Sequence, residues 1–150
     1  MWPFKKKPKD VGKTGVEQSW TMFHGEFDGK PLIARANAGL KPHVGHPNYS
    51  HHVGVSIPFQ NPDQNGFPQS DEAAELMNIE DRICAELEIG NQSLFAAVIT
   101  TNGMREFVFY TSNPEAVQTK LEKLKGEIRS HSVQVIIKHD ANWNTYREFV

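Results

Sequence analysis

The chain has one cysteine, no apolar run long enough to cross a membrane, and almost no net charge. The single cysteine, Cys84, excludes an internal disulfide and fits a reducing compartment. No stretch approaches the ~20 apolar residues of a membrane span, and the basic start is not followed by the apolar run of a signal peptide. A formal net charge of -2 lacks the basic excess typical of nucleic-acid-binding domains. We therefore expect a soluble cytoplasmic protein with neither a membrane nor a nucleic-acid partner.

The first residues differ in composition from the rest of the chain. Residues 1–15 contain five lysines and few residues that could build a core. Such segments stay mobile because they cannot bury enough apolar surface to offset the entropy of ordering. We predict a flexible basic tail at residues 1–15 and a single α+β domain at residues 16–150, a length suited to one domain.

Apolar periodicity between residues 51 and 139 predicts strand, helix, strand, strand, helix and strand, in that order. Alternating apolar residues indicate strands at 51–59, 94–100, 105–111 and 132–138, and helical spacing indicates helices that begin near residues 70 and 114. Asn102-Gly103 predicts the turn between the middle strands, Ser70 is the expected cap of the first helix, and Asn113-Pro114 opens the second. This order is a split βαβ arrangement, so we expect a ferredoxin-like sandwich.

Two further segments flank this unit. Asp28-Gly29 is a type I′ turn signal and predicts a hairpin before the first strand of the unit. A C-terminal tail contains Trp143, Tyr146 and Phe149. Two helices on one side of a four-stranded sheet leave its second face open, and large exposed apolar patches are rare in monomers. We expect the hairpin and the tail to cover that face, and the alternative is that another protein covers it.

The sequence contains no established catalytic motif. It has no Gly-x-Ser-x-Gly elbow, phosphate-binding loop or dinucleotide fingerprint. Cys84 lies beside the apolar stripe of the first helix, where a thiol is typically buried and inert. His43 and His46 alone have local chelating spacing for zinc, copper or nickel, with His51 nearby. A metal site there and ordinary solvated histidines both remain open, and we predict no cofactor.

Charge is distributed unevenly along the chain. The first helix carries seven acidic residues against one arginine, Arg82. An acidic helix face could steer a basic partner protein, which makes Glu75, Glu80 and Glu86 candidate binding residues; a solvated helix surface is the plain alternative. The aromatic strand at 105–110 lacks the glycine-spaced pattern of RNA-binding sheets, so its aromatic residues are expected to pack in the core.

Five short segments, taken in order, resemble the bacterial family known as domain of unknown function 695, over residues 20–149. They are Asp28-Gly29-Lys30-Pro31, Asn65-Gly66-Phe67-Pro68, Ile79-Glu80-Asp81, Arg105-Glu106-Phe107 with Phe109-Tyr110, and Asp140-x-x-Trp143-x-x-Tyr146-x-x-Phe149. The resemblance implies an α+β fold and no established activity. Members are associated with a domain like ribonuclease E inhibitor protein B, also a split βαβ fold, which implies regulation by protein contact.

From these segments we take Trp143, Tyr146 and Arg105 as further candidate binding residues. The aromatic pair has a structural interpretation as well, namely covering the sheet. We expect a non-enzymatic regulatory module that acts through contact with another protein. The alternative is a small-molecule or metal-dependent enzyme that uses His43, His46 and His51. The sequence does not predict an oligomeric state.

Overall fold

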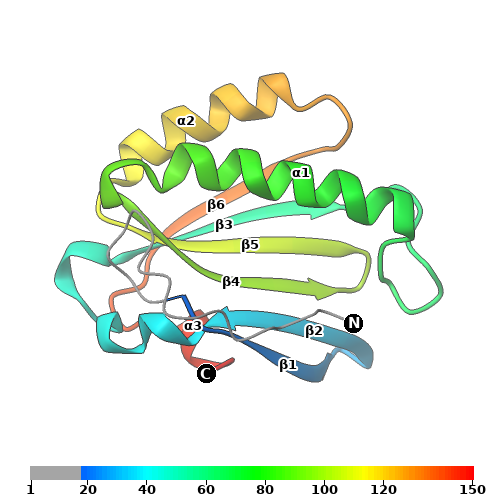
Figure 1. Cartoon of the computed structure of the whole chain (residues 1–150), viewed down its shortest axis with the longest axis horizontal. Helices are drawn as coiled ribbons and strands as arrows, with labels where there is room; N and C mark the ends of the chain where they lie inside the picture. The colour runs from blue at the N-terminus through cyan, green and yellow to red at the C-terminus, as the bar shows by residue number, and fades with distance from the viewer. Residues whose placement is uncertain (1–17) are drawn as a thin grey trace.

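The computed structural model describes residues 18–150, so the predicted basic tail lies outside the described residues. These residues form an α+β fold with one six-stranded antiparallel sheet (Figure 1). The strands are β1 (Trp20–Phe27), β2 (Lys30–Asn37), β3 (His51–Pro58), β4 (Ser93–Thr101), β5 (Met104–Thr111) and β6 (Gln134–His139). The α-helices are α1 (Ser70–Leu87), α2 (Pro114–Glu127) and the short α3 (Asn144–Arg147).

The turns that the sequence predicted are present. Asp28 and Gly29 have φ angles of 50° and 76°, and Asn102 and Gly103 have φ angles of 48° and 80°. A type I′ turn requires positive φ at both central residues, which is why these pairs reverse the chain. The side chain of Asn113 accepts a hydrogen bond from an amide in the first turn of α2, as a cap should.

The start of α1 differs from the prediction. Ser70 is the first helical residue, and the capping position belongs to Gln69, whose side chain makes no capping bond. Glu72 stabilises this end differently, by binding the amides of the segment that leads into the helix. The helix therefore begins where the sequence indicated, but the hydrogen bonds of Glu72 stabilise this end in place of a cap from Ser70.

The N-terminal hairpin extends the sheet instead of lying across its second face. The strand order is β1-β2-β4-β5-β3-β6, with β2 paired antiparallel to β4. This corrects the predicted four-stranded sheet covered by a hairpin, and the strand order differs accordingly. A physical reason is that β4 would otherwise leave a row of backbone groups unpaired at an exposed edge. Leu32, Ala34 and Ala36 of β2 are buried as a result.

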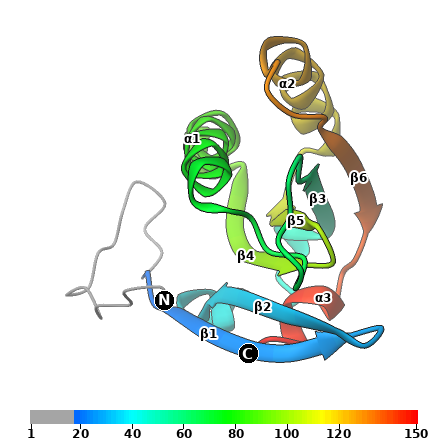
Figure 2. The ribbon, with the colours of Figure 1, turned by 90° about the vertical axis from the view of Figure 1, so that its right-hand side faces the viewer.

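Two apolar cores lie on opposite faces of the sheet. Figure 2 shows α1 and α2 on one side, and α3 beside β2 near the other end of the fold. The second core is built around Tyr110 and Trp143, whose rings stack at 4.2 Å and 6°. The prediction that the C-terminal tail covers the second face is confirmed for the part of the sheet that carries Tyr110. No helix within residues 18–150 is long and apolar enough to span a membrane.

Candidate ligand-binding cleft

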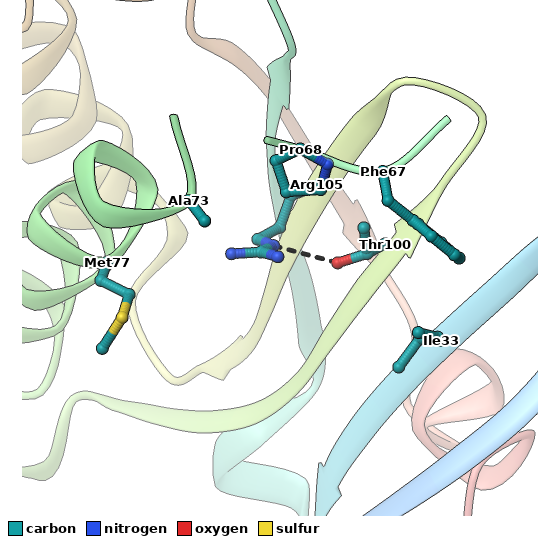
Figure 3. Close-up of a pocket in the computed structure, with 7 residues that line it drawn as sticks. All are labelled: Ile33, Phe67, Pro68, Ala73, Met77, Thr100 and Arg105. Atoms are coloured by element: carbon teal, nitrogen blue, oxygen red, sulfur yellow. Dashed lines mark hydrogen bonds between the residues drawn. The ribbon is translucent and has the colours of Figure 1, made fainter. Parts of the chain in front are cut away.

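A cavity of about 320 Å³ lies between α1 and the β2-β4-β5 part of the sheet (Figure 3). This volume is at the low end of the ~300–1,000 Å³ range of small-ligand pockets. Strands, helix and loop all contribute: the lining residues are Ile33 of β2, Thr100 of β4, Arg105 of β5, Ala73 and Met77 of α1, and Phe67 and Pro68 of the loop before α1. The cleft therefore combines apolar walls with one charged side chain.

Arg105 is buried at the floor of the cleft. Only 4% of it is exposed, and its Nε donates a hydrogen bond to Thr100 Oγ1 at 3.0 Å. Figure 3 shows the guanidinium extending from β5 toward α1. Burial lowers the pKa of Arg105 to about 10; the positive charge of Arg35 also lowers it, while Glu80 opposes the change. The side chain is therefore cationic at neutral pH, in a setting with little water.

An ion pair next to the cleft connects α1 to the sheet. Arg35 lies two residues after Ile33 on the same face of β2 and pairs with Glu80 of α1. Its guanidinium also lies over the rings of Trp20, at 5.2 Å, and Phe95, at 5.9 Å. Burial raises the pKa of the Glu80 carboxyl, and Arg35 opposes that effect. This ion pair and the ring contacts fix the distance between α1 and β2.

The loop that supplies Phe67 and Pro68 is anchored at its start and at its tip. At its start, Glu72 accepts hydrogen bonds from the Gln60 amide at 2.6 Å and the Asn61 amide at 3.2 Å, and its carboxylate bonds to His131 at 2.7 Å. Burial acts to raise the pKa of Glu72, but these hydrogen bonds outweigh it and the pKa is lowered. The loop wall is thus held by an ionised carboxylate.

The tip of this loop packs on the β4–β5 turn. Gly66 has φ +82°, and its carbonyl accepts a hydrogen bond from the Gly103 amide at 2.9 Å. A Cβ added to Gly66 would lie 3.0–3.1 Å from backbone atoms of Asn102 and Gly103. Glycine is therefore required at this position for two reasons, namely its positive φ angle and the close approach of the β4–β5 turn.

Of the predicted binding residues, Arg105 lines this cleft and Glu80 belongs to the ion pair next to it. Glu75 and Glu86 lie at neither. Glu75 is exposed, and Glu86 lies beside α2, where its backbone carbonyl accepts a hydrogen bond from Lys120 at 3.0 Å. Five residues along a helix turn the side chain by about 140°, so Glu75 and Glu80 point to different sides. Glu80 therefore does not share one acidic face with Glu75, and a binding role for Glu75 and Glu86 stays a prediction.

Trp143 and Tyr146 belong to the second core and not to a binding surface. Both are fully buried. The indole of Trp143 donates to the Tyr49 carbonyl at 2.8 Å, and the Tyr146 hydroxyl donates to the Asn37 carbonyl at 2.6 Å. Burial raises the pKa of Tyr146 to about 12. Because their polar atoms bond internally, the structural interpretation replaces the predicted binding role.

The candidate metal ligands are not brought together with further ligands. His46 is exposed and its Nδ1 accepts a hydrogen bond from the Asn48 amide at 3.1 Å, while His43 is half-buried. Within residues 18–150, no three His, Cys, Asp or Glu side chains converge to form a metal site. Cys84 is half-buried; burial, followed by the nearby Glu88 and Glu80 carboxylates, raises the pKa of its thiol far above the usual range.

Sequence reasoning missed Thr100, Met77 and Phe67 as parts of a site. One signal was available: Arg105 alternates with Phe107 and Phe109 on the apolar face of its strand, where a charge needs a partner or a ligand. The apolar members carry no such signal, because they resemble any other core residue. Only the fold brings together segments that lie up to 72 residues apart, from Ile33 to Arg105.

Comparison with known proteins gives one match. A family model described as a family of unknown function, DUF695, matches residues 18–150. Neither the curated proteins nor the solved structures include one that matches the chain. Three of the five segments noted above border the cleft or its ion pair: 65–68, 79–81 and 105–107.

Proposed function

The chain belongs to the DUF695 family, and because that family has no known function, we propose one from the geometry of this protein. It is a non-enzymatic binding module that takes an anionic ligand with an apolar body into the cleft beside α1. The observation that carries this proposal is Arg105, a cationic side chain only 4% exposed that lines an otherwise apolar cavity. We also propose that the module acts through contact with a partner protein and that it does so in the cytoplasm.

Physical chemistry supports an anion at this position. A buried guanidinium loses much of its hydration, and hydrogen bonds between ionised groups are stronger in a low-dielectric environment than in water. The hydrogen bond that Arg105 donates to Thr100 fixes the orientation of the guanidinium before a ligand arrives. Apolar walls then favour a ligand whose remaining surface is apolar.

The lining also supports binding over catalysis. Among the described residues that line the cleft, only Thr100 and Arg105 carry polar side chains. General acid–base chemistry requires a group that exchanges a proton near the working pH, and nucleophilic chemistry requires an activated nucleophile. Burial raises the pKa of Glu80, but its carboxyl already pairs with Arg35, so we do not assign it a catalytic role.

We also propose that the segment from β3 to β6 is a ferredoxin-like unit to which the hairpin has been added. With β1 and β2 set aside, the remaining strands lie in the order β4-β5-β3-β6, and each neighbouring pair is antiparallel. This order supports the proposal, since each helix then connects two parallel strands that are not adjacent. A fold of this kind does not by itself imply any function.

A pair of fluorescent probes tests the binding function. 2-Naphthoate is an apolar carboxylate, and 2-naphthamide is its uncharged counterpart. We expect saturable binding of both, with the anion bound more tightly. R105M should weaken anion binding by about tenfold, the equivalent of one charge-assisted hydrogen bond, and leave the neutral probe unaffected. The matched control is R82M, because Arg82 is exposed on α1 and pairs with Glu127 away from the cleft.

A second variant keeps the test valid if R105M does not fold. Met77 is 57% exposed at the mouth of the cleft, so M77E should fold and should repel the anion. A85E places the same charge on an exposed position of α1 outside the lining and is its control. Anion binding that is unchanged in both R105M and M77E would overturn the proposed function.

A further inference from the structure

We propose that the natural ligand of the cleft is the C-terminal residue of a partner protein, with its free carboxylate on Arg105 and an apolar side chain against the walls. This inference rests on the proposed function and names its ligand. It follows from the depth of the charge, the size and polarity of the cavity, and the charges at its mouth.

The charge lies deep and the apolar surface lies at the mouth. Arg105 is 4% exposed, whereas Met77 is 57% exposed. A ligand must therefore enter with its anionic group first and leave its remaining part toward solvent. A protein chain end has this shape, because the carboxylate is the last group and the preceding chain extends in one direction only.

The polarity of the lining favours a carboxylate over a phosphate. A planar guanidinium matches the two oxygens of a carboxylate. A phosphate group has more oxygens to satisfy, and in the described lining only Thr100 stands beside Arg105 as a polar side chain. Oxygens directed at Phe67 or Ile33 would remain without hydrogen bonds, which is costly in a buried site.

The size of the cavity favours a chain end over an internal acidic residue. About 320 Å³ accommodates one residue and not a helix or a long acyl chain. An internal aspartate or glutamate would bring backbone on both of its sides against the apolar walls, and those amides and carbonyls would lose their hydrogen bonds with water. A terminal residue brings backbone on one side only.

The mouth of the cleft indicates what precedes that last residue. On the helix side, Asp81 follows Met77 by four residues, which places both on one face of α1, and Asp81 is exposed. On the hairpin side, His24 is the register partner of Ile33 and is exposed as well. A chain that leaves the cleft beside Asp81 gains from a lysine or arginine close to its end. The partner therefore ends in an apolar residue with a basic residue shortly before it.

Peptide pools test this inference by fluorescence anisotropy. Each pool has five random residues followed by leucine and exists as a free acid and as a C-terminal amide. We expect the free-acid pool to bind at least tenfold more tightly than the amide pool, and R105M or M77E to abolish that difference. A pool with lysine fixed two residues before the end should bind more tightly than one with glutamate there, and D81N should reduce this preference.

N-acetylleucine distinguishes a chain end from a free small acid. If the inference is correct, it binds more weakly than the peptide acid, because it lacks the preceding residues. Equal binding of acid and amide pools, equal binding of N-acetylleucine and peptide, or no peptide binding would overturn the inference. The naphthoate probe separates the two proposals: if its binding still depends on Arg105 while peptides fail to bind, the binding function stands and only the ligand is wrong.

Discussion

Arg105 and Thr100 face each other across the β4–β5 hairpin, and the Nε of Arg105 donates to the Thr100 hydroxyl at 3.0 Å. Both side chains are at least nine-tenths buried. The turn between them, Asn102-Gly103, sets the register that makes them opposite. A short local motif thus places a buried cation at the floor of a cleft whose other walls come from distant parts of the chain.

Removing the hydroxyl of Thr100 should weaken the site. T100V keeps the shape of the side chain but leaves Nε without its acceptor, so we expect anionic probe binding to fall several-fold. The free energy of unfolding should fall by about 1–3 kcal/mol, the usual cost of a buried group that loses its partner. Urea unfolding and probe titration measure the two effects. T119V, on the exposed face of α2, is the control, and equal behaviour of the two variants would refute the role of Thr100.

Gly66 should tolerate no side chain. G66A introduces a Cβ at 3.0–3.1 Å from the backbone of the β4–β5 turn and forces an alanine to φ +82°. G29A is the matched control, because Gly29 has φ +76° with nothing within 4 Å. We expect G29A to cost about 1 kcal/mol from backbone strain alone. G66A should cost more and should also reduce probe affinity, because Phe67 moves with the loop; identical losses in the two variants would contradict this.

The contribution of Glu72 should depend on pH. Its folded pKa is lowered below 4.5, so the unfolded state binds more protons between the two values, and stability rises with pH in that window. The contribution of the carboxylate is complete above pH 4.5 and is lost as the pH falls through the folded pKa. Wild type should therefore exceed E72Q in unfolding free energy at pH 7, and the difference should shrink below pH 4.5.

The control for Glu72 is Glu75, an exposed residue one turn further along α1. Replacing it by glutamine should change stability little at either pH. Denaturant unfolding at several pH values measures all three proteins. A difference between wild type and E72Q that stays constant from pH 7 to pH 3 would show that the hydrogen bonds from Gln60 and Asn61 do not require an ionised carboxylate.

Trp143 should matter for stability and not for ligand binding. W143F keeps an aromatic ring over Tyr110 but loses the hydrogen bond to the Tyr49 carbonyl, for a cost of about 1–2 kcal/mol. W143A should cost about 3–5 kcal/mol, because it leaves a cavity in the second core. Thermal or urea unfolding tests both values. Folded W143F should bind the anionic probe like wild type, and weaker binding would return Trp143 to the candidate binding residues.

Local signals explain why much of the fold could be predicted. Asp28-Gly29 and Asn102-Gly103 reverse the chain through their own φ preferences, and Asn113 caps α2 with its own side chain. Such features act over a few residues, so neighbouring sequence contains all the information. The pairing of β2 with β4 lacks a local signal, because it depends on which edge of the sheet is free once the other strands have assembled.

The candidate site was predictable only in part, for the same reason. Arg105 is detectable as a charge on an apolar strand face, but its surroundings are not. Glu80 had the appearance of one acidic residue among several on α1, and only the position of Arg35 on β2 gives it a different role from Glu75. Spacing along a helix predicts which side chains share a face, yet not which strand that face meets.

The most direct test of the central claim is the side-chain Nε–H resonance of Arg105 in a ¹H–¹⁵N spectrum, assigned by its absence in R105K. A leucine-terminated peptide acid should shift this resonance together with the amides of Phe67 and Met77, and the corresponding peptide amide should not. If the acid instead perturbs residues on the opposite face of the sheet, around His52 and Glu106, and leaves Arg105 unchanged, the cleft beside α1 is not the binding site.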